Sequence, residues 1–226
     1  MNRWTGTFIA MLACALLAVV VFFLLDFSAN RSFSSPQEVI DAIRLASQKD
    51  DARAWCQCLT DESRDLLAAT LIVEEFSKKQ EKEKAGTEEQ KALIHAVDKV
   101  FAQHGLTEDV LMKMQREFLT LSHPKAPMAE KVKAARAVIA PVNDPNGFVA
   151  DLFQTVQKTS RSESPLSMWK NAKLTDVQIT GKTAEGVVSI GPGQPENYLF
   201  RKQGESWRLD LFPEEKRPPG LPLGHP

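Results

Sequence analysis

Residues 171–212 constrain the fold of this chain more than any other stretch, because apolar and polar side chains alternate there in four short runs. Alternation with a period of two is typical of strands that bury one face and expose the other to water. The alternating apolar positions are, run by run, Leu174, Val177 and Ile179; Ala184, Gly186 and Val188; Tyr198 and Phe200; Trp207, Leu209 and Leu211. We therefore expect a four-stranded antiparallel meander with one apolar face.

Glycine-containing segments separate these runs. Gly181 is followed by Lys182 and Gly204 by Glu205, and glycine accepts the positive φ that tight hairpin turns require. Residues 191–195 contain two prolines, which cannot donate to a strand ladder, so a longer loop is expected there. Four strands with one apolar face need a covering layer, and the helices predicted upstream are the candidates.

Helix periodicity and helix caps fill the chain before the strands. Ser35 is followed by Pro36 and Glu38, which is typical of a helix start with a serine cap, proline in the first helical position and a capping-box glutamate. Further helices are predicted to start at Ala52, Thr60, Thr87, Thr107, Pro127 and Asp144, and the helix from Thr107 is expected to end before Pro124. The expected fold class is α+β, with several amphipathic helices first and the meander last.

The composition divides the chain into four parts. Residues 1–27 are expected to form a signal anchor with a transmembrane helix, and residues 28–34 a short polar linker. Residues 35–212 are expected to form one α+β domain with a helical insertion at about 66–160. Residues 213–226 contain five prolines and two glycines, which is typical of a disordered tail.

An apolar run of 18 residues lies near the N-terminus, at residues 8–25, which begin with Phe8 and end with Leu25. The run has no charge and no proline, and as a helix it measures about 27 Å, close to the hydrocarbon thickness of a bilayer. Arg3 precedes the run. This charge favours a single-pass orientation with the N-terminus in the cytoplasm and the bulk of the chain outside the cell membrane, in the periplasm or at the cell exterior.

A cleaved signal peptide is one alternative to the anchor, and a lipoprotein signal is another. Small residues are expected one and three positions before a signal cleavage site, but a cut after Ala29 puts Phe27 at one of these positions. Cys14 follows a segment similar to a lipoprotein box, but the apolar run continues for eleven residues beyond it. The sequence therefore favours the uncleaved anchor.

The composition and the motifs exclude several function classes. A net charge of −1 gives no basic surface of the kind that nucleic acids require, so we expect no nucleic-acid partner. The four histidines lack the spacing of metal ligands, and no P-loop or Gly-x-Ser-x-Gly motif occurs, so no metal or cofactor is expected. Cys56 falls on the apolar face of the second helix, whereas Cys58, about 200° further round, is expected to leave that face.

Tyr198 is the only tyrosine in the chain and the single candidate for a catalytic residue. It shares a predicted strand face with Phe200, and a tyrosine hydroxyl beside a carboxylate can polarise a carbonyl or take a proton. The alternative is a core tyrosine whose hydroxyl lies at the rim of the sheet. Asp176 and Asp210 alternate with the apolar face and should point away from Tyr198, which favours the second interpretation.

Parts of the chain are similar to nuclear transport factor 2-like (SnoaL-like) domains. The matching segments are Ser-Pro-Gln-Glu-Val at 35–39, Trp55, Leu59, Asp-Glu-Ser-Arg at 61–64, and the strand patterns at 174–184 and 204–210. The resemblance implies a cone-like fold in which a curved antiparallel sheet wraps around helices and forms an apolar pocket. Some members of this family are isomerases or hydrolases, and many secreted bacterial members have no known activity. No catalytic residue of the family maps onto this chain.

Three functions remain open on these observations. The leading expectation is a non-catalytic module on the outer side of a bacterial cell membrane that binds an envelope protein partner or a small apolar ligand. The first alternative is a cone-fold enzyme, of isomerase or hydrolase type, that uses Tyr198 in its pocket. The second alternative is a structural spacer close to the membrane. The sequence sets no oligomeric state.

Overall fold

The computed structural model describes residues 32–82, 86–191 and 194–213. The chain divides into two compact units, Met1–Ser32 and Phe33–Pro226. The described residues belong almost entirely to the second unit. The predicted anchor at residues 8–25 lies outside the described part, as does nearly all of the predicted tail. Within the described part, no helix is both long enough and apolar enough to cross a bilayer.

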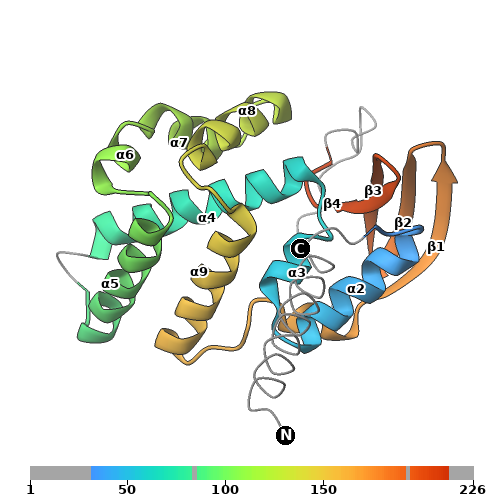
Figure 1. Ribbon diagram of the computed structural model, residues 1–226, viewed down its shortest axis with the longest axis horizontal. Coiled ribbons are helices and arrows are strands. Elements are labelled where there is room, and N and C mark those ends of the chain that lie inside the picture. The colour runs from blue at the N-terminus through green and yellow to red at the C-terminus, as the bar shows by residue number, and fades with distance from the viewer. Residues whose placement is uncertain (1–31, 83–85, 192–193, 214–226) are drawn as a thin grey trace, which may run out of the picture. The chain divides into compact units, whose positions relative to one another are not determined.

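Helices occupy the first two thirds of this unit and strands the last third (Figure 1). The helices are α2 (Pro36–Gln48), α3 (Ala52–Cys56), α4 (Asp61–Lys82), α5 (Glu88–Gln103), α6 (Glu108–Met112), α7 (Gln115–Ser122), α8 (Met128–Ile139), α9 (Pro145–Ser160) and the 3₁₀ helix η1 (Ser167–Asn171). The strands are β1 (Lys173–Thr180), β2 (Thr183–Ser189), β3 (Glu196–Gln203) and β4 (Ser206–Asp210). The α+β class that the sequence predicts is therefore confirmed.

The four strands form one antiparallel sheet in the order β1-β2-β3-β4, which is the predicted meander. Gly181 and Gly204 occupy the two short turns with φ of 62° and 59°, so the positive φ predicted for these glycines is present. The loop between β2 and β3 contains two residues, 192 and 193, that lie outside the described part.

A β-bulge explains why the apolar residues of β1 break strict alternation. The pairing of β1 with β2 shifts between Thr175 and Gln178, and Asp176 in between has a φ of 53°. An extra residue in one strand returns the following side chains to the original face. Leu174 and Ile179 consequently lie on the same face of the sheet.

Helix α2 covers this face, which we call the inner face. Ile40 and Ile43 of α2 are fully buried in one core with Phe200 and Leu209 of the sheet. Helix α2 contacts β1, β4, α3 and η1, and Figure 1 shows it lying alongside the strands. The helix begins as predicted, because Ser35 Oγ accepts a hydrogen bond from the Glu38 backbone at 3.2 Å.

The remaining helices form a second layer around the long helix α4. Helices α8, α9 and α5 contact α4, α7 packs on α8, and Figure 1 shows α4 crossing between them. The single helix predicted from Thr107 is wrong, since α6 ends at Met112 and α7 starts at Gln115. The backbone of Met114 bonds to Leu111 at 3.0 Å, and such an i to i−3 bond tightens the last turn and ends the α-helical ladder.

Backbone hydrogen bonds from the N-terminal part of the unit close the outer edge of β4. Leu209 N–H donates to the Cys58 carbonyl at 2.8 Å, Thr60 N–H donates to the Leu209 carbonyl at 2.9 Å, and Trp207 N–H donates to the Phe33 carbonyl at 2.9 Å. This pairing places Cys58 in the core. The prediction that Cys58 leaves the apolar face is therefore wrong, because α3 ends at Cys56 and the residues that follow run beside β4.

Phe33 fastens the first described residues to the sheet. Its side chain is buried, its N–H donates to Ser206 Oγ at 2.8 Å, and the Arg208 guanidinium lies 4.9 Å from the centre of its ring. Burial lowers the pKa of Arg208, although nearby acidic groups oppose the shift. A cation over an aromatic face contributes about 0.5–1 kcal/mol at exposed sites and more when it is desolvated.

The inner-face core predicts a clear contrast between two single substitutions. Leu209→Ala removes a fully buried side chain between α2 and the sheet, and we expect it to lower the free energy of unfolding by about 2–5 kcal/mol. Ile179→Ala removes an exposed side chain of the same face and should change the free energy by less than about 0.5 kcal/mol. Urea denaturation of the two variants measures the difference, and equal losses would contradict this description of the core.

Candidate functional site

Tyr198 lies on the inner face, as the sequence predicts, and is half-buried. Tyr198 belongs to β3 and pairs with Gly186 of β2. Its ring meets that of Trp169 of η1 edge to face, with the centroids 5.8 Å apart. Trp169 in turn meets Trp55 of α3 at 6.0 Å. Three aromatic rings from three elements therefore form a continuous row beneath the sheet.

The Tyr198 hydroxyl has one hydrogen bond within the described part of the chain, to Glu196 Oε2 at 3.4 Å. Glu196 stands two residues earlier on the same strand and is exposed to solvent. Burial, together with the negative charge of Glu196, raises the pKa of the Tyr198 phenol to about 12. A phenol with this pKa stays protonated at neutral pH, and an exposed carboxylate gives it little driving force as an acid or base.

The structure does not bring Asp210 or Asp176, the two aspartates considered in the sequence, to Tyr198. Asp210 lies opposite Leu199, and its Oδ2 accepts a hydrogen bond from Arg201 Nε at 2.7 Å. Asp176 is exposed in the bulge of β1. The surroundings of Tyr198 consequently resemble a packed aromatic at the rim of a sheet more closely than a catalytic centre.

A buried polar network joins the start of α4 to the end of β4. Ser63 Oγ donates to Asp210 Oδ1 at 3.0 Å, and it accepts hydrogen bonds from Thr60 Oγ1 and from the Leu211 N–H, both at 2.9 Å. Thr60 and Ser63 are fully buried. The carboxylate of Asp210 also holds Arg201, so every member has a partner, as the stability of a buried network requires.

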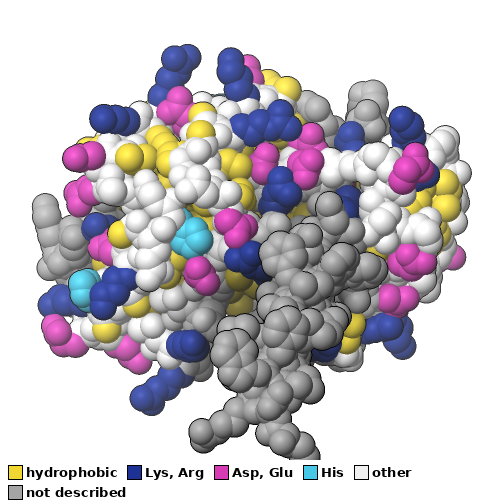
Figure 2. Space-filling model, in the orientation of Figure 1, with side chains coloured by type: hydrophobic (Ala, Val, Ile, Leu, Met, Phe, Trp, Pro, Cys, Tyr) yellow, Lys and Arg dark blue, Asp and Glu magenta, His cyan; other side chains and the backbone are white. Residues whose placement is uncertain are grey.

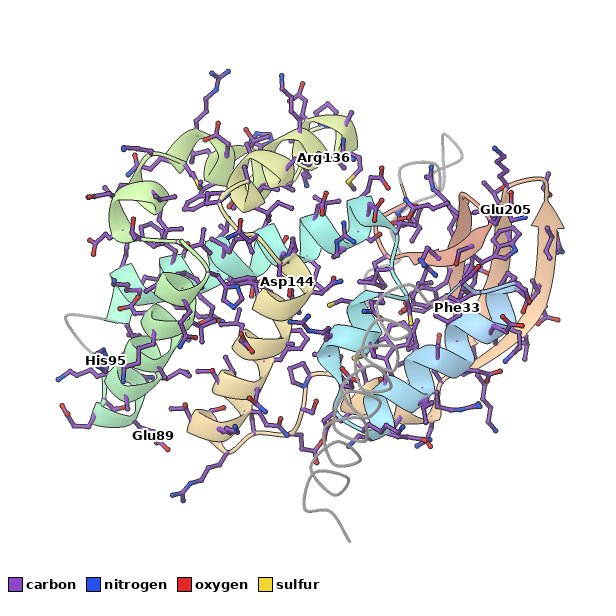
Figure 3. The ribbon with its side chains drawn as sticks, in the orientation of Figure 1. Phe33, Glu89, His95, Arg136, Asp144 and Glu205 are labelled. Carbon is purple, nitrogen blue, oxygen red and sulfur yellow. The ribbon has the colours of Figure 1, made fainter. Side chains whose placement is uncertain are left out.

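A second group of charges extends this contact to α8. Arg136 of α8, labelled in Figure 3, reaches Glu62 Oε1 at 3.2 Å and Asp65 Oδ2 at 3.6 Å on α4. Burial raises the pKa of Asp65, while Arg64 and Arg136 oppose that shift. These residues were not identified from the sequence, since nothing local pairs α8 with α4. Because their ion pairs join α8 to α4, we assign these residues a structural role.

The inner face has an uncovered corner on β1. Val177 and Ile179 are 39% and 58% exposed, although the sequence predicts both for the apolar face. Gly186 separates this corner from Tyr198, and a Cβ placed on Gly186 would lie 3.5 Å from Val177 Cγ2 and only 2.6 Å from Leu174 Cδ1. Glycine thus lets the side chains of β1 lean over β2. Helix α2 packs on the sheet but leaves these two side chains in contact with water.

Histidine and cysteine side chains form no reactive cluster in the described ranges. No group of three or more His, Cys, Asp or Glu residues there is arranged to hold a metal ion. His104 closes α5 and contacts Asp151 of α9 at 2.9 Å, which links two helices. Cys56 is a buried free thiol, and burial raises its pKa to about 12, so it is a poor nucleophile at neutral pH.

Comparisons with known proteins identify no relative of the chain. No family model matches, and no similar protein was found among the curated proteins or among the solved structures. The class that the fold defines is an α+β unit with a C-terminal four-stranded antiparallel sheet. The resemblance to nuclear transport factor 2-like domains stays a prediction.

The phenol of Tyr198 is a direct test of this description, because it is the only tyrosine in the chain. Phenolate absorbance should be absent at the ordinary tyrosine midpoint of about pH 10 and should develop toward pH 12. Glu196→Gln removes a negative charge that disfavours the phenolate, so the midpoint should move down. Ultraviolet titration measures both midpoints while circular dichroism monitors folding. An unshifted midpoint in the folded chain would show that the hydroxyl is solvated.

Proposed function

We propose that the chain is a non-catalytic module, tethered to the outer side of a cell membrane by residues 8–25, that binds a partner protein through the uncovered corner. The observation that carries this proposal is the exposure of Val177 and Ile179 on an otherwise buried face. Exposed apolar side chains that adjoin one another mark protein contacts, whereas apolar residues scattered singly over a surface do not. The corner lies beside a strand edge that no other strand of the described sheet covers.

Side chains, not a ladder of backbone hydrogen bonds, would make this contact. The bulge at Asp176 divides β1 into two short stretches and twists its edge, and bulges of this kind discourage the addition of another strand. Val177 and Ile179 lie at and beyond the bulge, where their side chains remain available. A partner with an apolar side chain at the centre of its contact surface fits this corner.

A partner protein fits the structure better than a small apolar ligand. The cone-like fold that the resemblance to nuclear transport factor 2-like domains implies would place an apolar pocket between α2 and the sheet. Ile40, Ile43, Phe200 and Leu209 are fully buried there and fill the centre of that space with side chains. On the face seen in Figure 2, acidic and basic side chains are interspersed, so that face offers no broad surface of one charge.

The tether restricts where the partner is found. Seven residues, 26–32, separate the predicted anchor from Phe33, and seven extended residues reach at most about 25 Å. A unit held within this distance of the bilayer meets partners that are themselves in or close to the membrane. In the alternative function, that of a structural spacer close to the membrane, the same tether is present but no partner binds.

A photoreactive side chain at position 179 of the full-length chain tests the binding surface. We expect Ile179→p-benzoylphenylalanine to give one discrete adduct with another protein in native membranes. The same substitution at Lys182, an exposed turn position beyond the corner, serves as the control and should give none. Absence of any adduct at 179 would favour the spacer, and an adduct of twice the mass of the chain would identify a second copy as the occupant.

A topology reporter tests the tether independently of any partner. An alkaline phosphatase domain fused after Phe212 should be active, because that enzyme folds only when exported, and the fusion should resist extraction from membranes at alkaline pH. Replacement of Leu17 and Val20 by Arg within the apolar run should abolish both properties, since each charge costs about 2.5–3.5 kcal/mol at the centre of a membrane helix. Activity of a cytoplasmic reporter at the same position would reverse the proposed orientation.

A further inference from the structure

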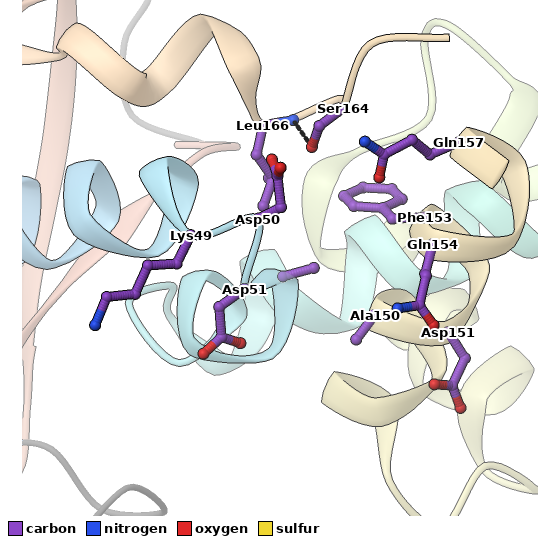
Figure 4. A pocket seen from close by; sticks show the side chains of 11 residues that line it. Lys49, Asp50, Asp51, Ala150, Asp151, Phe153, Gln154, Gln157, Ser164 and Leu166 are labelled. Carbon is purple, nitrogen blue, oxygen red and sulfur yellow. Dashed lines mark hydrogen bonds between the residues drawn. The ribbon is translucent and has the colours of Figure 1, made fainter. Parts of the chain in front are cut away.

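A polar cleft of about 300 Å³ lies where three segments of the unit meet. The turn between α2 and α3 forms one wall, α9 forms the opposite wall, and the loop from α9 to η1 closes one end. Figure 4 shows Phe153 and Gln157 of α9 projecting toward Asp50 and Leu166, whereas Lys49 and Asp151 point away. Pockets for small ligands begin at about this volume, so the cleft fits one small ring.

Polar groups inside the cleft keep hydrogen-bonding capacity that the fold does not use. Ser164 is only 8% exposed, and its Oγ accepts a hydrogen bond from the Leu166 N–H at 3.2 Å. The proton of that hydroxyl has no acceptor among the residues that the structure describes. The side-chain amide of Gln157, across the cleft, likewise bonds to no described residue. The Ser164 hydroxyl and the Gln157 amide can therefore both donate hydrogen bonds to a molecule in the cleft.

Asp50 provides the negative charge of the cleft. The other two carboxylates of the cleft already have partners, because Asp51 caps α3 by accepting from the Ala54 N–H at 2.9 Å and Asp151 contacts His104. Among the residues that the structure describes, the Asp50 carboxylate has one loose contact, with Lys170 Nζ at 3.8 Å. Its oxygens therefore retain acceptor sites for a donor in the cleft.

We propose that this cleft binds a small hydroxylated molecule that carries an ammonium group, of the size of a single amino sugar. Asp50 accepts hydrogen bonds from the ammonium group, and Ser164 and Gln157 exchange hydrogen bonds with the hydroxyls. Phe153 packs its ring against the apolar face of the molecule. Hydroxyls suit Ser164 and Gln157 because they both donate and accept, as these side chains do. The site is independent of the uncovered corner and of the membrane tether.

Glucosamine and glucose are matched probes of the site, since an ammonium group in one replaces a hydroxyl in the other. Isothermal titration of the full-length protein in detergent micelles should show glucosamine binding about tenfold more tightly than glucose, because a hydrogen bond between two charged groups is stronger than one to a neutral hydroxyl. Asp50→Asn keeps the shape of the side chain and should remove this preference. Gln157→Leu should weaken the binding of both sugars.

Asp176→Asn is the control, because Asp176 is also an exposed aspartate with positive φ, 53° against 52° for Asp50. Asparagine tolerates this conformation, so both variants should fold as the wild-type chain does. The preference for glucosamine should survive in Asp176→Asn. Equal affinity for the two sugars, absence of binding, or the same loss in both aspartate variants would each overturn the proposal.

Discussion

Three backbone hydrogen bonds along the outer edge of β4 determine how the whole unit is assembled. They join Phe33, Cys58 and Thr60, which lie early in the chain, to the last strand. Phe33 stands just before α2, and the segment from Cys58 to Thr60 stands between α3 and α4. Helices α2 and α4, which both contact β4, are therefore positioned by the last strand in the sequence. Buried backbone groups at an edge need such partners, because an unpaired one costs about 1–3 kcal/mol.

The two edges of the sheet consequently differ in what they offer to other molecules. The β4 edge is closed by the chain itself, and the network of Ser63, Asp210 and Arg201 reinforces that closure from the side of α4. The β1 edge has a bulge and two exposed apolar side chains instead. In the described sheet, only the β1 edge therefore leaves apolar side chains open to another molecule, which is why we propose the uncovered corner, and not Tyr198, as the binding surface.

Local signals in the sequence predicted those parts of the fold that depend on neighbouring residues. The caps at Ser35 and Thr87 and the turns at Gly181 and Gly204 act within a few positions, and each is present in the structure. The burial of Cys58 was not predictable, because it depends on β4, which lies about 150 residues further along the chain. The bond between Ser63 and Asp210 spans 147 positions and has no local signature.

The same distinction between local signals and contacts of distant residues applies to the candidate sites. The inner-face position of Tyr198 follows from strand alternation, which is a local property. The exposure of Val177 and Ile179 depends on how much of the sheet α2 covers, and no pattern within β1 encodes that. Asp50, Gln157 and Ser164 converge on the cleft from three separate segments, so no motif in the sequence announces them.

The attachment of Phe33 to the sheet has a mechanical consequence for the proposed tether. Tension that arrives along the chain from residues before Phe33 meets a buried ring, a guanidinium stacked on it and two hydrogen bonds to the β4 segment. The load passes directly into the strands, and the helices from α5 to α9 lie off that path. A pull on the proposed tether would strain the sheet first and would reach the helices from α5 to α9 through α3 and α4, so the two parts of the unit would yield at different forces.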